Sequence, residues 1–183
     1  LKTAREIDAG AIGGLRPINV AFLSTFTSEI LSPYLTVECA RRGLLANPHF
    51  APFNQLEQQV LDSTGPLYQS EPDFIVLATR LEELAPNLVD RFVSLSADDI
   101  ESESAAIEQR VGGLNDGLRR STNATILVFD FAAPHLTAAG LADSALKRSQ
   151  SSVVQRANDL LANLCRWQRF LCRPALFYRA DSG

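Results

Sequence analysis

The sequence predicts a three-layer α/β fold around a parallel sheet of about five strands, because short apolar runs alternate with helical segments along the chain. Four mostly apolar runs indicate buried strands, at 18–23, 74–78, 125–129 and 174–178. Strands that alternate with helices pair in parallel through right-handed crossovers. The expected sheet is therefore flavodoxin-like, with strand order 2-1-3-4-5.

In the first third of the chain, local signals set the expected element boundaries. Residues 1–16 are expected to form a lead-in segment. Residues 24–28 are rich in hydroxyls that can cap a following helix, in which Pro33 lies near the start and Gly43 marks the stop. Residues 44–53 indicate an irregular second strand, because their prolines favour a position at the edge of the sheet.

The remaining elements have similar signals. A short helix over 54–61 opens with Asn54 and Glu57 at the spacing of a capping box, and residues 62–66 form a turn. A helix is expected over 84–93. A longer one starts at Asp98 or Asp99, where one buried stripe follows the i, i+4, i+7 pattern. The last helix covers 153–164.

Length and composition place the chain among globular domains. Its 183 residues fit one domain, and 46% hydrophobic with 21% charged residues is close to the globular norm. No apolar run approaches the roughly 20 residues that span a bilayer, and the N-terminus does not resemble a signal peptide. We therefore expect a cytoplasmic protein without a membrane partner.

Charge and cysteine content exclude further classes. A net charge of -4 disfavours a nucleic-acid partner, since such binding needs a dense basic surface. Cys39, Cys165 and Cys172 are too few and too scattered for a disulfide framework or a zinc site, so free thiols are expected. No metal site and no cofactor is predicted.

A site is expected where the strand order reverses, at the carboxyl ends of the strands. Ser24 or Thr25 is the candidate nucleophile and His135 the candidate base. The candidate substrate-binding residues are Thr27, Ser63, Thr79, Arg80 and Asp130. Each also has a structural interpretation: the hydroxyls can cap a helix, the arginine can be ion-paired or solvated, the aspartate can cap a loop and the histidine can be exposed.

Several stretches of the chain, by their order and spacing, are similar to one known family. They are 20–27, 41–43, 53–55, 61–68 and 72–77, followed more loosely by 114–115 and 126–130. The segment from Ile18 to Leu77 thus resembles the N-terminal domain of the FkbH-like family. These are proteins of polyketide and related biosynthesis whose downstream domain is a phosphatase of the haloacid-dehalogenase (HAD) type.

The resemblance extends to the fold of SGNH hydrolases, which use a Gly-Asp-Ser turn, a Gly-x-Asn-Asp turn and a late Asp-x-x-His. This chain has the segment 23–27 at the first turn and 78–80 at the second, without the asparagine, and it contains no Asp-x-x-His. The one Gly-x-Asn-Asp, at 113–116, falls inside the long predicted helix and is read as chance. A hydroxyl without a base is a weak nucleophile, so self-contained ester hydrolysis is not expected.

The family resemblance implies chemistry that this chain lacks. Family members use a HAD Asp-x-Asp motif to handle phosphate with magnesium, and they load a glyceryl-type unit onto an acyl carrier protein. Here the nearest match, Asp130-Phe131-Ala132, lacks the second aspartate. We therefore expect the accessory half of such a transferase, part of a longer polypeptide with a C-terminal HAD domain.

An acidic carrier protein would need a basic docking patch. The candidates are the pairs Arg119-Arg120 and Lys147-Arg148, which can equally be ordinary solvated positions. Two other functions stay open. One is a divergent SGNH-type esterase or acyltransferase. The other is a structural, homodimerising domain that associates through aromatic side chains near the early loops, such as Phe53 and Tyr68.

Overall fold

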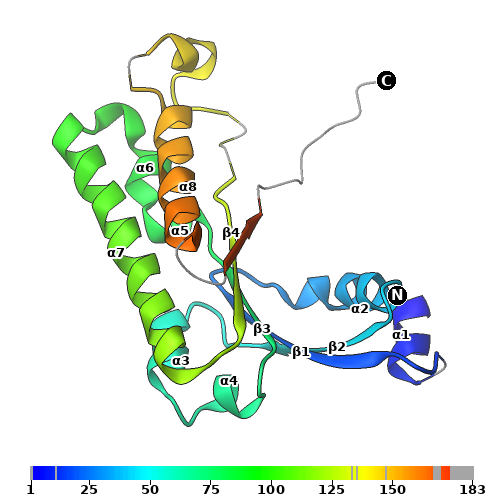
Figure 1. The fold of residues 1–183 in the computed structure, drawn as a ribbon. Coiled ribbons are helices and arrows are strands. Elements are labelled where there is room, and N and C mark those ends of the chain that lie inside the picture. The colour runs from blue at the N-terminus through cyan, green and yellow to red at the C-terminus, as the bar shows by residue number, and fades with distance from the viewer. Residues whose placement is uncertain are drawn as a thin grey trace, which may run out of the picture. The chain divides into compact units, whose positions relative to one another are not determined.

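The computed structural model describes residues 2–10, 12–132, 134, 136–146, 148–166 and 170–173 (Figure 1). Its strands form one sheet of order β2-β1-β3-β4-β5. They are β1 (Arg16–Ser24), β2 (Leu44–Phe50), β3 (Phe74–Ala78), β4 (Thr125–Phe129) and β5 (Phe170–Arg173). The predicted fold class is confirmed, and so is the order 2-1-3-4 of the first four predicted strands. The strand predicted over 174–178 lies outside the described residues.

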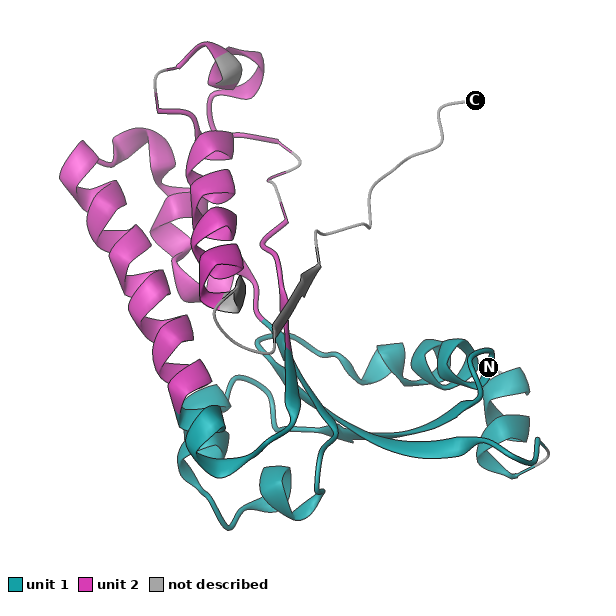
Figure 2. Cartoon of the chain, in the orientation of Figure 1, with its two compact units in different colours: residues 1–78, 117–126 teal, residues 79–116, 127–183 magenta. Residues whose placement is uncertain are grey.

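Helices connect the strands. The α-helices are α1 (Lys2–Asp8), α2 (Ser32–Ala40), α3 (Leu56–Leu61), α4 (Pro66–Gln69), α5 (Leu81–Leu84), α6 (Pro86–Asp90), α7 (Ala97–Ser121) and α8 (Gln150–Arg166). Short 3-10 turns are η1 (Glu29–Leu31), η2 (Phe92–Ser94) and η3 (Gly140–Ala145). None of the helices that the structure describes is long and apolar enough to cross a membrane. The chain divides into two compact units, residues 1–78 with 117–126 and residues 79–116 with 127–183 (Figure 2).

The first unit is built on three parallel strands. β1 pairs in parallel with β2 on one side and with β3 on the other, with Ser24 opposite Ala78 at the carboxyl end. The rings of Phe22 and Phe50 stack with centroids 4.9 Å apart, which joins β1 to β2. Pro48 is tolerated because β2 is the edge strand of the sheet. In this unit α1 and α2 lie on one side of the sheet, and α3 and α4 on the other (Figure 1).

One glycine of this unit is required by packing. At Gly117, in the last turns of α7, an added Cβ would collide with Cγ1 of Val60 in α3. The glycine therefore lets the two helices approach closely. The same helix also has Gly112 and Gly113, where a Cβ would meet nothing within 4 Å.

Several local predictions for the first unit were wrong. The lead-in contains α1, which buries Ala4 and Ile7. The capping box expected from Asn54 does not form, since α3 begins at Leu56 after Gln55, and Gln55 makes no side-chain capping bond. Ser28 precedes η1 but does not cap it. Its hydroxyl bonds instead to another serine of the same turn.

The second unit has one long helix and several short ones. α7 opens with a reciprocal capping box: Ser96 N donates to Asp99 Oδ2 at 2.9 Å, and Asp99 N donates to Ser96 Oγ at 3.1 Å. Its predicted stripe is confirmed, since all four residues are buried: Ile107, Val111, Leu114 and Leu118. The helix predicted over 84–93 is wrong, because Pro86 interrupts it and leaves α5, α6 and η2.

Candidate functional site

The turn after β1 contains a buried cluster of three hydroxyl side chains. Ser24 is 3% exposed, Thr25 1% and Ser28 2%. Ser24 Oγ donates to the Phe26 carbonyl at 2.8 Å and lies 2.9 Å from Ser28 Oγ. Because a hydroxyl has one proton to donate, Ser28 is the donor in the second bond. Ser24 is thus bonded on both sides inside the protein.

Backbone hydrogen bonds hold this turn to its neighbours. Thr25 N donates to the Ala78 carbonyl at the end of β3, at 3.2 Å, and Asn54 N lies 3.4 Å from the Ser24 carbonyl. Asn54 has a φ of 53°, a left-handed conformation that asparagine tolerates better than most residues. Thr27 is the exposed hydroxyl of the turn.

A serine nucleophile needs a base to take its proton. Among the described residues, no carboxylate and no imidazole is a hydrogen-bond partner of Ser24. His49 is in β2 opposite Ala21, three residues before Ser24 in the register, and its Nε2 is buried without a hydrogen-bond partner. His135, the predicted base, lies outside the described residues. The described hydrogen bonds of Ser24 thus include no base that could activate its hydroxyl.

The other candidate substrate-binding residues are spread over both units. In the first unit Ser63 is exposed, in a turn where Asp62 Oδ1 accepts hydrogen bonds from the Thr64 amide and hydroxyl. In the second unit Thr79 is buried and Asp130 is half-buried. Arg80 is exposed and lies 3.4 Å from Glu82, an exposed pair of the kind that adds little stability.

The predicted basic positions differ from one another. Arg119 is half-buried, and its Nη1 donates to the Ala124 carbonyl at 2.9 Å, so it satisfies a backbone group just beyond the end of α7. Arg120 and Arg148 are exposed. Lys147 lies outside the described residues. Within the described ranges, no group of three or more His, Cys, Asp or Glu side chains could hold a metal ion.

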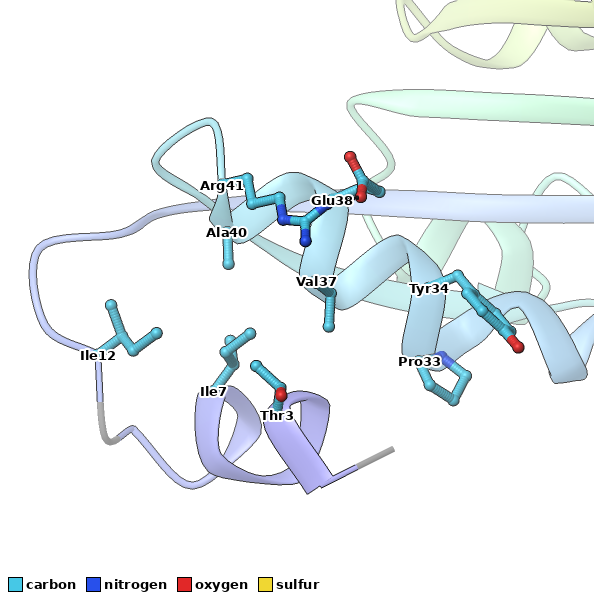
Figure 3. A pocket seen from close by; sticks show the side chains of 9 residues that line it. All are labelled: Thr3, Ile7, Ile12, Pro33, Tyr34, Val37, Glu38, Ala40 and Arg41. Carbon is cyan, nitrogen blue, oxygen red and sulfur yellow. Dashed lines mark hydrogen bonds and ion pairs between the residues drawn. The ribbon is translucent and has the colours of Figure 1, made fainter.

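An apolar groove lies between α1 and α2, in the first unit (Figure 3). It has a volume of about 520 Å³, and Ile7, Val37 and Ala40 line it. Glu38 at its rim forms an ion pair with Arg41 at 2.6 Å, so these two charges neutralise each other. The lining is suited to apolar contact, and it provides no nucleophile paired with a base.

The strand order and the layers define a class of domain, a flavodoxin-like or SGNH-like α/β sheet. The chain is similar in structure to the N-terminal part of a Bacteroides fragilis protein that contains a phosphatase domain and was crystallised with Mg. The TM-score is 0.68 at 18% identity, and the match covers 88% of this chain but only 41% of that one. This chain thus spans less than half the length of the Bacteroides chain.

A second solved structure is an α/β hydrolase from the metagenome of Lake Arreo, Spain, with a TM-score of 0.47 and 9% identity. That match covers 86% of this chain and 77% of the hydrolase. No protein-family model matches the sequence, and neither does any curated protein. At these identities the structural likeness concerns the fold alone.

Proposed function

We propose that this chain is a non-catalytic accessory domain of an FkbH-like enzyme. In this proposal it works beside a HAD-type phosphatase domain of the same polypeptide, and the whole enzyme loads a glyceryl-type unit onto an acyl carrier protein. The phosphate chemistry belongs to the phosphatase domain, and this domain contributes binding and positioning.

The observation that carries the proposal is the burial of the Ser24 hydroxyl in the turn after β1. In an SGNH hydrolase this position would present the nucleophile, whereas here Ser24 is buried and bonded to Phe26 and Ser28. Supporting it, the chain shares its fold with the N-terminal part of a protein that contains a phosphatase domain. The FkbH-like motifs at 20–27 and 72–77 agree with that position in a longer protein.

The test is hydrolysis of p-nitrophenyl acetate and butyrate by the wild-type chain and by Ser24→Ala and Thr25→Ala. We expect no turnover above buffer in any of them. Turnover by the wild type that either substitution abolishes would replace the proposal with the divergent esterase or acyltransferase.

The proposed carrier-protein partner has its own test at the basic pair Lys147-Arg148. Binding of an acyl carrier protein is expected to weaken in Lys147→Glu and Arg148→Glu, because these changes put negative charge opposite an acidic partner. Arg119→Ala is unsuited to this test, since Arg119 is bonded to Ala124 and its loss would disturb the end of α7. Equal affinity in wild type and both glutamate variants would show that Lys147 and Arg148 are not the docking site.

A further inference from the structure

The segment after β4 displays leucines in solvent. Within residues 136–146, Leu136 is 83% exposed, Leu141 102% and Leu146 48%. We call residues 136–146 the docking loop. In Figure 1 it lies beyond the N-terminal end of α8, in the same compact unit. Exposed loops are usually polar, and several leucines exposed on one short loop are typical of an interaction surface.

The loop is held in place by polar groups that point inward. Gln150, which is 2% exposed, accepts a hydrogen bond from Ala138 N at 2.8 Å. Its amide nitrogen donates to the carbonyls of Leu88, at 2.8 Å, and Val89, at 3.1 Å. One side chain thereby ties the start of the loop to α6. The exposed leucines are consequently presented by an anchored backbone.

The second anchor is Asp143, which is 3% exposed. Its carboxylate accepts hydrogen bonds from Gln150 N at 2.8 Å and Ser151 N at 3.2 Å, in the first turn of α8. Burial alone would raise the pKa of Asp143, but the hydrogen bonds from Ser151 and Gln150 outweigh it and the pKa is lowered. The carboxylate is thus committed to capping the helix.

The charge of the segment complements an acidic partner. Asp143 is the one acidic residue between Phe131 and Ser149 in the sequence, and it is buried in its capping bonds. Arg148 follows Leu146 by two residues and is exposed. The outward chemistry of the loop is therefore apolar side chains beside a cation, with no exposed carboxylate among its described residues.

We propose that the docking loop binds an acidic partner protein that presents apolar side chains, with the leucines filling its apolar surface and Arg148 meeting its carboxylates. The inference deepens the proposed function, and it rests on that proposal for the choice of an acyl carrier protein as the partner. Hydrophobic anchors with a charged rim are the usual arrangement of such interfaces.

The charges favour a protein over an anionic bilayer as the occupant. Binding to anionic lipid through charge uses clusters of about four to eight Lys or Arg side chains. This segment carries two, Lys147 and Arg148, which is fewer than such binding uses.

The experiment titrates a fluorescently labelled, purified acyl carrier protein with the chain and follows anisotropy. We expect Leu141→Asp to raise the Kd by at least about tenfold and Arg148→Glu by several-fold. The matched control is Leu61→Asp, because Leu61 is 76% exposed in α3 of the other unit. It is expected to bind like the wild type. Circular dichroism should show the same fold in all variants, since each change is at an exposed side chain.

Three results would overturn the inference: wild-type affinity in Leu141→Asp, no binding of the carrier protein by the wild-type chain, or Leu141-dependent binding to phosphatidylglycerol vesicles in place of the carrier protein. The first result is compatible with the proposed carrier-protein partner and contradicts only the role of the docking loop in binding it. Failure of the accessory-domain proposal is read separately, from ester hydrolysis that depends on Ser24.

Discussion

The turn after β1 and the docking loop after β4 differ in which side chains they expose to solvent. In the turn, Ser24 and Ser28 are buried and bond to each other, so their hydroxyls face inward. In the docking loop, the polar Asp143 is buried in helix-capping bonds while Leu141 is fully exposed. The hydroxyls of Ser24 and Ser28 are thus withdrawn from solvent, whereas the Leu141 side chain is presented to it.

The largest expected effect comes from removing the anchor of the loop. Gln150→Ala leaves the Ala138 amide and two α6 carbonyls without their partner, and each unsatisfied buried group costs about 1–3 kcal/mol. The free energy of unfolding should fall by about 3 kcal/mol in urea titration. Gln155→Ala, at an exposed position of the same helix, is the control and should stay within about 0.5 kcal/mol of wild type.

A smaller loss is expected when the hydroxyl cluster is broken. Ser24→Ala removes the donor to Phe26 and the acceptor for the buried Ser28 hydroxyl, which should lower the free energy of unfolding by about 2 kcal/mol. Thr27→Ala, at the exposed hydroxyl of the same turn, should change it by less than about 0.5 kcal/mol. Equal stability of the two variants would mean that the buried cluster contributes nothing to the fold.

The pH dependence of stability also distinguishes the two regions, because the docking loop is held by a buried carboxylate and the described bonds of the turn are between hydroxyl and backbone groups. The pKa of Asp143 is lowered in the folded state, so its contribution is present above the unfolded pKa of about 3.9 and is lost as pH falls through the folded pKa. Thermal unfolding between neutral and acidic pH should show wild type and Asp143→Asn converging as the solution is acidified. A constant difference would contradict the capping role.

The smallest effect is expected at the tip of the loop. Leu141 is fully exposed, so Leu141→Ser removes no buried contact and should change the free energy of unfolding by less than about 0.5 kcal/mol. A loss comparable to that of Ser24→Ala in the same urea titration would show that Leu141 is part of the core. The leucine would then not be available for docking.

Local patterns were enough to predict most of the sheet. The strands at 74–78 and 125–129 have the predicted bounds, since a continuous apolar run in a buried strand is a local signal. α1 was missed because only Ala4 and Ile7 of its seven residues are buried, too few for a recognisable period. The break before α6 had a signal, Pro86, which disfavours helix in the residue before it.

The site could be predicted only in outline. The sequence indicates hydroxyls at the end of β1, but the bond from Ser28 to Ser24 depends on the path of the turn. In the same way, Leu141 is of a residue type that is usually buried. Its exposure follows from the tertiary bonds of Gln150 and Asp143, and the sequence has no local signal for either.

The most direct test of the closed turn is covalent labelling of the intact chain with a fluorophosphonate, which reacts with activated serines, followed by mass spectrometry of the peptides. Because Ser24 is buried and its hydrogen bonds within the described residues go to Phe26 and Ser28, we expect no adduct at Ser24 or Thr25 under conditions that fully label a serine hydrolase. An adduct at Ser24 that is absent in Ser24→Ala would contradict it, and would identify a working nucleophile in this turn.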